Sequence, residues 1–391
     1  MKKKFLRLNS ALHSLSAASL ISYSMPSLAV GVGAGTTLVG NDANAYTWSQ
    51  VATLDIGLFN LTGSVTHDFS GFDGTIKSMG GSITGDVDNS VSTGGTLEFT
   101  FNTPSVTGLI GATYPLTEIK SGNNAALTTS SAAKAMSVTL DNGGNMIANG
   151  DVNTNTLTIN SGSIFTANGK LLNLAGSTQP SLVYSGDGTV KISDSIVEVP
   201  SMTNTSGNGT LILTNVAGAT LKNGSVGSFA NPLKSFDWTT GQTLTLSDAG
   251  ASIYSQTIGL SPSLTIGAQA QNLVLSGTLG ANVTINFVTQ LNNDVTLYGP
   301  LTSSATITGA SNGYGTLKVD PGAGNTTTLG GVLGAPSSFN MQTVSGCVSL
   351  SADLNTSQHN IASGSILDIG IHKASAVILD ASDSKVIVAG G

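Results

Sequence analysis

The chain has 391 residues, of which 39% are hydrophobic, 9% are charged and 5% are aromatic, and 49 of them are glycines. Its net charge is −7 at pH 7 and Arg7 is its only arginine, so binding to nucleic acid or to an anionic membrane is disfavoured. Cys347 is the only cysteine, so no internal disulfide can form, and we expect it to be a small buried hydrophobe beside Val348.

Residues 1–29 have the parts of a secretory signal peptide. Three lysines and Arg7 precede an apolar segment at 11–21, and small residues end at a cleavage site predicted after Ala29. The apolar segment is too short and too polar for a membrane-spanning helix, and the alternative is an ordinary N-terminal helix. Beyond residue 29, ten lysines against 21 acidic residues give a net charge of about −11.

Residues 30–150 are expected to form an N-terminal cap and the first, irregular coils of a solenoid. End repeats are atypical because they must close an exposed core. The Ala-rich run at 125–136 could form one short helix, although its threonines and serines weaken that reading. Loops are expected to hold Trp48, Phe69 and Phe72, and short strands are predicted within residues 52–58, 74–76, 82–83, 96–101 and 137–140.

From residue 151 onward, short segments that alternate apolar and polar residues recur between turns rich in Gly, Asn, Ser and Asp. Such alternation is typical of a strand with one buried face. Between residues 242 and 329 the segments pair into a unit of roughly 20 to 24 residues, a period typical of solenoids. The sequence therefore predicts an all-β parallel β-helix, with an antiparallel sandwich or barrel as the alternative. The segments in this stretch are residues 244–246, 264–266, 273–275, 283–285, 295–297, Ile307, 317–319 and Leu329.

The strand pattern continues to residues 385–388 and stops at Gly390 and Gly391 without a polar cap. A solenoid that ended there would expose a strand edge and its core, which favours aggregation. We therefore expect the coils at 151–391 to be incomplete at their C-terminal end.

The signal peptide, the Gly/Thr/Asn-rich coils and the scarcity of Cys, Lys and Arg resemble the passenger region of an autotransporter, a type V secretion protein. Residues 227–236 and 293–302 have a texture similar to rickettsial-type surface cell antigens, and the resemblance covers roughly residues 150–391. It implies a right-handed parallel β-helix, displayed at the surface or outer membrane of a Gram-negative bacterium or released from it. It also implies virulence-related adhesion to a host-cell or cell-surface protein or glycan. The family's translocator barrel is missing from this chain, so a separate barrel is an expected partner.

Two motifs suggest catalysis but fit a structural role better. Residues 309–313 (GASNG) match the G-x-S-x-G nucleophile pattern, which needs a following helix; here another strand pattern follows, so we predict a turn. His67 and Asp68 could form an acid/base pair, but we expect an exposed loop pair. The histidines lack the paired spacing of a zinc site.

A β-helical enzyme that acts on polysaccharide, as a calcium-dependent lyase or a hydrolase, is the alternative function. The sequence lacks the Asp-Asp, Gly-His-Gly and Arg-x-Lys motifs of the hydrolases, and it has no arginine after Arg7 for a lyase. Residues 86–89 (DVDN) could contribute to a calcium site, but we expect a solvated turn. We therefore predict a non-catalytic adhesin or structural surface protein that has no catalytic, cofactor-binding or metal-binding residues, no cofactor, no nucleic-acid partner and no transmembrane segment.

Overall fold

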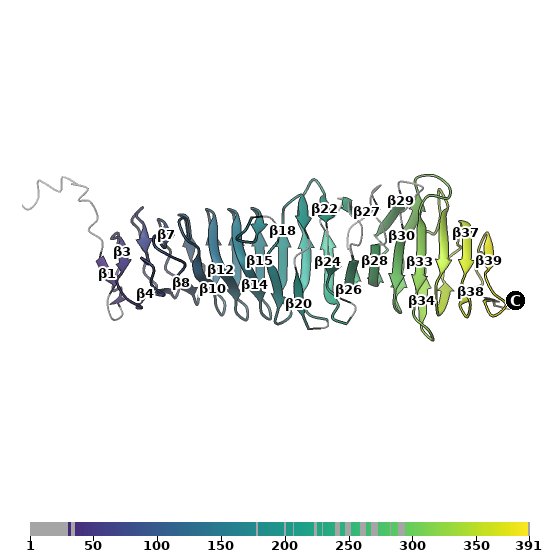
Figure 1. Ribbon diagram of the computed structural model, residues 1–391, viewed down its shortest axis with the longest axis horizontal. Coiled ribbons are helices and arrows are strands. Elements are labelled where there is room, and N and C mark those ends of the chain that lie inside the picture. Colours follow the sequence, from purple (N-terminus) through teal and green to yellow (C-terminus); the bar gives the residue numbers. More distant parts are fainter. Residues whose placement is uncertain are drawn as a thin grey trace, which may run out of the picture.

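The computed structural model describes residues 30–389 except 33–35, 177–178, 199–200, 206, 223–224, 229, 239–242, 247–251, 259–262, 267–272, 282 and 288–293. The predicted signal peptide (residues 1–29) and the terminal Gly390 and Gly391 lie outside the described residues. The described part consists of strands and connecting loops, without a helix, and its strands follow one another along a rod (Figure 1). The predicted all-β parallel β-helix is confirmed.

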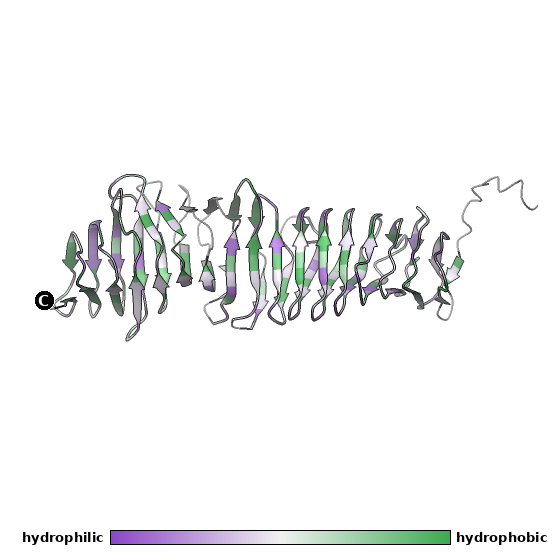
Figure 2. Cartoon of the chain, turned by 180° about the vertical axis from the view of Figure 1, so that it is seen from behind, coloured by the Kyte–Doolittle hydropathy of each residue, from purple (hydrophilic) through white to green (hydrophobic). Residues whose placement is uncertain are grey.

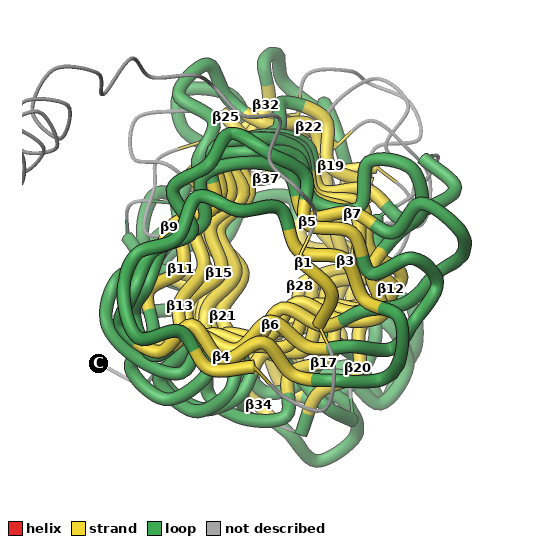
Figure 3. The backbone as a smooth tube through the Cα atoms, turned by 90° about the vertical axis from the view of Figure 1, so that its left-hand side faces the viewer, coloured by secondary structure: helices red, strands yellow, loops and turns green. Residues whose placement is uncertain are grey.

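Three rows of parallel strands, which we call A, B and C, surround the interior of the rod (Figure 3). Most strands pair with one strand of the coil before and one strand of the coil after. The first run of row A consists of β2 (Thr36–Thr37), β4 (Thr53–Gly57), β6 (Thr75–Ser78), β8 (Thr96–Phe99), β10 (Leu116–Ser121), β12 (Ala133–Leu140), β14 (Val152–Ile159), β17 (Ser181–Tyr184) and β20 (Met202–Asn204). Its second run consists of β23 (Ser225–Val226), β26 (Ser252–Ile258), β28 (Leu273–Leu279), β30 (Asp294–Tyr298), β33 (Thr316–Asp320), β35 (Phe339–Thr343), β37 (Thr356–Ile361) and β39 (Val377–Leu379).

Rows B and C complete the cross-section. Row B consists of β9 (Ser105–Val106), β11 (Ala126–Thr129), β13 (Asn145–Ala148), β15 (Ile164–Ala167), β18 (Thr189–Ile192), β21 (Thr210–Leu213), β24 (Leu233–Trp238), the ends of β26 and β28, and then β31 (Thr302–Ser303), β34 (Thr326–Leu329), β36 (Cys347–Leu350), β38 (Ile366–Gly370) and β40 (Lys385–Val388). Row C consists of β1 (Val30–Val32), β3 (Tyr46–Trp48), β5 (His67–Asp68) and β7 (Val87–Asp88), then β16 (Leu171–Leu172), and finally β19 (Ile196–Glu198), β22 (Ala219–Lys222), β25 (Thr243–Leu246), β27 (Ser263–Ile266), β29 (Thr284–Phe287) and β32 (Thr306–Gly309).

The coils vary in length. Paired residues are separated by as few as 16 positions, at Val30 and Tyr46, and by as many as 27, at Ser225 and Ser252. The predicted unit of roughly 20 to 24 residues falls within this range. Before residue 110 the strands have two to five residues each.

The core is a stack of aliphatic columns. In row A the register aligns one inward residue per coil, and alternation along each strand turns the next residue outward. Figure 2 shows this alternation of apolar and polar residues along the strands. One such column consists of Leu54, Ile76, Leu97, Ile119, Val138, Leu157 and Leu182, all of them buried.

The adjoining outward column has charges of alternating sign. Asp55 pairs with Lys77, Lys77 with Glu98, and Glu98 with Lys120 in successive coils. Lys120 also forms a 3.1 Å ion pair with Asp141. Neighbouring opposite charges on one face of a sheet favour this register.

Several local expectations about residues 30–150 are wrong. The Ala-rich run contains no helix, because its residues belong to β11 and β12, whose alternate side chains enter the core. Trp48 lies in β3 and not in a loop. Its ring is buried, because alternation along β3 turns Tyr46 and Trp48 inward, and its ring centroid lies 4.5 Å from that of Phe69.

Candidate functional site

His67 and Asp68 are not an exposed loop pair. Both belong to β5, where successive side chains point to opposite faces, so His67 is buried and Asp68 points outward. Asp68 accepts hydrogen bonds from the main-chain N–H and the hydroxyl of Ser70 and of Ser90. These bonds lower the pKa of Asp68, although burial opposes them. This carboxylate therefore fixes two turns and is not paired with the imidazole.

The other two described histidines are also separate from one another. His359 in β37 is buried, and its Nε2 lies 2.9 Å from the Thr343 hydroxyl oxygen. Burial lowers its pKa to about 4, so the ring is neutral at pH 7. His372 Nδ1 lies 3.7 Å from an Asp353 carboxylate oxygen near the surface.

The acidic residues at 86–89 organise loops. Asp86 accepts a 2.7 Å hydrogen bond from the main-chain N–H of Leu109. Asp88 accepts bonds from the N–H and the hydroxyl of Thr113, at 2.9 and 2.6 Å. Asp88 is buried at the end of β7, so the expected solvated turn is wrong at this residue. Within the described parts of the chain, no three His, Cys, Asp or Glu side chains lie close enough together to hold a metal ion.

The G-x-S-x-G match is a turn, as predicted. Strand β32 ends at Gly309 and β33 starts at Thr316, so strand follows strand where a nucleophile elbow needs a helix. The Asn312 side chain accepts a 3.0 Å bond from the Ser338 N–H of the next coil. Ser311 therefore stands in a structural connection.

Cys347 differs from its expected position. It lies on the outer face of β36 and is partly buried, whereas its neighbour Val348 occupies the core position. Because successive side chains of a strand point to opposite faces, Cys347 and its neighbour Val348 lie on opposite sides of β36. Burial raises the pKa of the Cys347 thiol, which makes it a weaker nucleophile at neutral pH.

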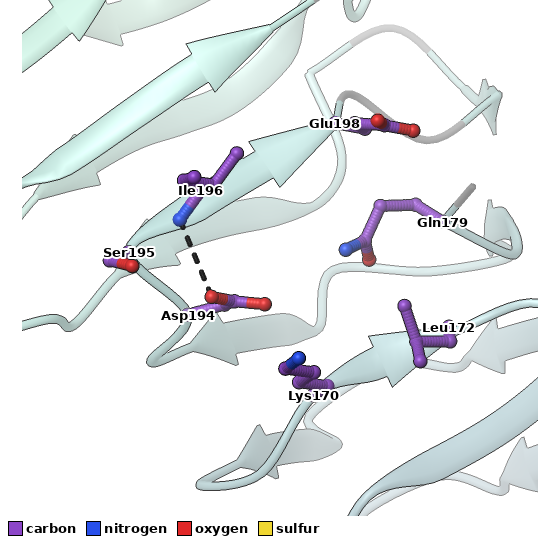
Figure 4. A pocket seen from close by; sticks show the side chains of 7 residues that line it. All are labelled: Lys170, Leu172, Gln179, Asp194, Ser195, Ile196 and Glu198. Carbon is purple, nitrogen blue, oxygen red and sulfur yellow. Dashed lines mark hydrogen bonds between the residues drawn. The ribbon is translucent and has the colours of Figure 1, made fainter. Parts of the chain in front are cut away.

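A pocket of about 330 Å³ lies where row C is interrupted (Figure 4). Strand β16 pairs with β14, and β19 pairs with β22, but no pairing between described residues joins β16 to β19. We call this the row C pocket; it is lined by Lys170, Leu172, Gln179, Asp194, Ser195, Ile196 and Glu198.

The interruption follows a change in coil length. Ser137 and Thr156 are paired 19 residues apart, but Thr156 and Ser181 are paired 25 residues apart. In the shorter coil, β14 runs from row C into row A as one strand. In the longer coil, the rows are occupied by separate strands, β16 and β17, and Gln179 lies in the connection between them.

Polar groups of both kinds meet in the row C pocket. The side chains of Asp194, Gln179 and Lys170 are directed toward one space, and Glu198 is directed away from it (Figure 4). Gln179 is 8% exposed, and its Oε1 is buried without a hydrogen-bond partner among the described residues. An Asp194 oxygen is held 3.4 Å from the main-chain N of Ile196. This arrangement can bind a polar ligand, and sequence reasoning missed it because its residues come from three separate segments.

The described residues contain no helix capable of crossing a membrane. Comparison with known proteins adds no relative: no protein-family model, curated protein or solved structure matches the chain.

Proposed function

We propose that the protein is an autotransporter-type passenger that acts at the cell surface by binding and has no catalytic role. Residues 1–29 would direct its export, and a separate translocator barrel would place it at the outer membrane of a Gram-negative bacterium or outside the cell. The observation that carries this proposal is the parallel β-solenoid itself. Each coil adds length and outward surface while it buries its aliphatic residues against its neighbours.

The chemistry of the outer face supports a binding role. Outward positions of the strands are rich in Thr, Ser, Asn and Lys, as in β14 and β18, and these side chains donate and accept hydrogen bonds. A repetitive surface of this kind can contact a partner along several coils at once. The proposed partner is a protein or glycan on a host cell or on a neighbouring cell.

The placement of the reactive groups is consistent with this proposal. His67 and His359 are packed in the core, and Asp68, Asp86 and Asp88 accept hydrogen bonds from loops. A general acid or base needs access to a substrate proton. A binding function does not need these groups, so the histidines can stay packed in the core and the aspartates can keep their hydrogen bonds to the loops.

Binding of the fluorescently labelled, purified chain to cultured host cells tests the proposal. We expect saturable binding at micromolar concentration, displaced by unlabelled chain and lost after thermal unfolding. Binding that rises linearly with concentration and resists displacement would count against adhesion. N-terminal sequencing of the exported chain tests the export step: a start at Val30 is expected, and a start at Met1 contradicts it.

A further inference from the structure

We propose that the row C pocket is a glycan-binding site that holds one or two pyranose rings. This inference deepens the proposed surface-binding function and rests on it, since it assigns a contact site and a ligand class to that function. The argument depends on the unpartnered Gln179 oxygen, the mixture of donors and acceptors, and the apolar walls.

Gln179 gives the first reason to expect a ligand. Its side chain is more than nine-tenths buried, yet the carbonyl oxygen has no donor in the described part of the chain. Buried acceptors in folded proteins nearly always have a donor, since an unmade hydrogen bond is unfavourable. A ligand that supplies an O–H or N–H to this atom would satisfy it.

The remaining polar groups limit the chemistry of that ligand. Asp194 is an acceptor, Lys170 is a donor, and the Ser195 hydroxyl can act in both ways. A simple cation would be repelled by the like charge of Lys170, and a simple anion would be repelled by that of Asp194. A neutral ligand with several hydroxyl groups can instead donate to the carboxylate and the amide oxygen while it accepts from the ammonium group.

Two aliphatic side chains supply the apolar surface that a sugar ring requires. Leu172 is partly buried, and Ile196 is 50% exposed at the edge of β19. The C–H face of a pyranose can pack against such side chains while its hydroxyl groups face the polar residues. The volume of about 330 Å³ lies near the lower end of the range of roughly 300 to 1,000 Å³ for ligand pockets, which favours one or two rings over a long chain.

Saturation-transfer NMR and calorimetry on the purified full chain test this site. The probes are glucose, galactose, mannose, N-acetylglucosamine, N-acetylgalactosamine, lactose, maltose and chitobiose. We expect at least one of them to bind, with a dissociation constant near the millimolar range that is usual for ligands of about a dozen non-hydrogen atoms.

Two variants probe the polar contacts, and each has a matched control. Gln179→Met removes the amide at similar size, and Asp194→Asn removes the charge but keeps an oxygen that can accept from Ile196 N–H. We expect each to weaken saccharide binding about tenfold or more. Gln342→Met in β35 and Asp353→Asn, which also caps a main-chain N–H, should leave binding unchanged.

The outcomes separate this inference from the proposed function. If the chain binds to cells but none of the saccharides binds to the chain, the proposal of a glycan site is wrong and the proposed surface-binding function stands. Equal saccharide binding by all four variants would place the sugar elsewhere. If a pocket variant does not fold, cross-linking of the unmodified chain with a diazirine-labelled saccharide decides, because labelling must fall on residues 170–172, 179 or 194–198.

Discussion

The ring of Tyr46 stacks on the ring of His67 inside the rod, with their centroids 5.9 Å apart. The Tyr46 hydroxyl donates a 2.6 Å hydrogen bond to Asp42, whereas neither ring nitrogen of His67 has a partner among the described residues. Burial lowers the pKa of His67 to about 4, against a smaller opposing effect of the Asp42 charge. The imidazole is therefore neutral at pH 7 and packs as an aromatic ring.

We expect the protein to lose stability as the pH falls from about 6.5 to about 4. Histidines of the unfolded chain gain protons near pH 6.5, whereas folded His67 and His359 stay neutral down to about pH 4. The unfolded state then binds more protons, so unfolding is favoured by up to about 3 kcal/mol for each histidine. Urea unfolding at pH 7.5, 5.5 and 4.5 measures this loss.

Replacement of His67 isolates its contribution. His67→Phe keeps a ring against Tyr46 and removes the titrating group, so the free energy of unfolding should fall less between pH 7.5 and 4.5. Phe99→Leu, which changes a buried ring but removes no titrating group, is the control and should keep the slope of the unmodified chain. An unchanged slope in His67→Phe would show that this histidine does not oppose protonation.

The sequence predicted the solenoid because its signal is the sum of many short alternating segments. All the segments predicted between residues 242 and 329 lie in or beside strands. His67 and Phe69, two residues apart, are both buried, but both were predicted to lie in loops, because a histidine reads as polar and its core position was missed. His67 is accommodated in the core by stacking on the Tyr46 ring of the preceding coil, and no local sequence pattern encodes this contact.

The row C pocket could not be predicted in the same way. Its residues, from Lys170 to Glu198, come together because two successive coils fail to pair in one row. The only signal in the chain is the coil length, which rises from 19 to 25 residues after Thr156. A longer coil indicates an added loop, but it does not say which side chains the loop brings inward.

Gly315 is expected to tolerate no side chain. Its φ is +72°, and an added Cβ would lie 2.1 Å from ring carbons of Phe287. Gly324 has a similar φ of +77° but open space around it. Gly315→Ala should therefore cost about 2 to 4 kcal/mol, against about 1 kcal/mol of backbone strain for Gly324→Ala.

Thermal unfolding of the two glycine variants measures this difference. Phe287→Leu in the Gly315→Ala background should restore part of the loss, because it removes the ring that the Cβ meets. Equal effects of the two alanine substitutions would show that backbone conformation alone accounts for the cost.

Lys77 is expected to stabilise its row by charge. It lies between Asp55 and Glu98 in the outward column of row A. Lys77→Glu would place three like charges in successive coils and should cost about 1 kcal/mol relative to the neutral Lys77→Met. The difference should shrink in 1 M NaCl, where the Debye length is about 3 Å. A difference that persists in high salt would point to packing of the side chain as its cause.

Leu211 and Ile212 are adjacent in β21 and test which face of the strand enters the core. Leu211 is fully buried between Val190 and Phe236 of the neighbouring coils, whereas Ile212 is turned outward and only partly buried. Leu211→Ala should cost about 2 to 5 kcal/mol because it leaves a cavity among close-packed neighbours. Ile212→Ala should cost about 1 kcal/mol or less, since surface substitutions away from the core are mild. Urea midpoints of both variants give the comparison, and the reverse order of costs would mean that the strand is shifted by one residue, which exchanges its two faces.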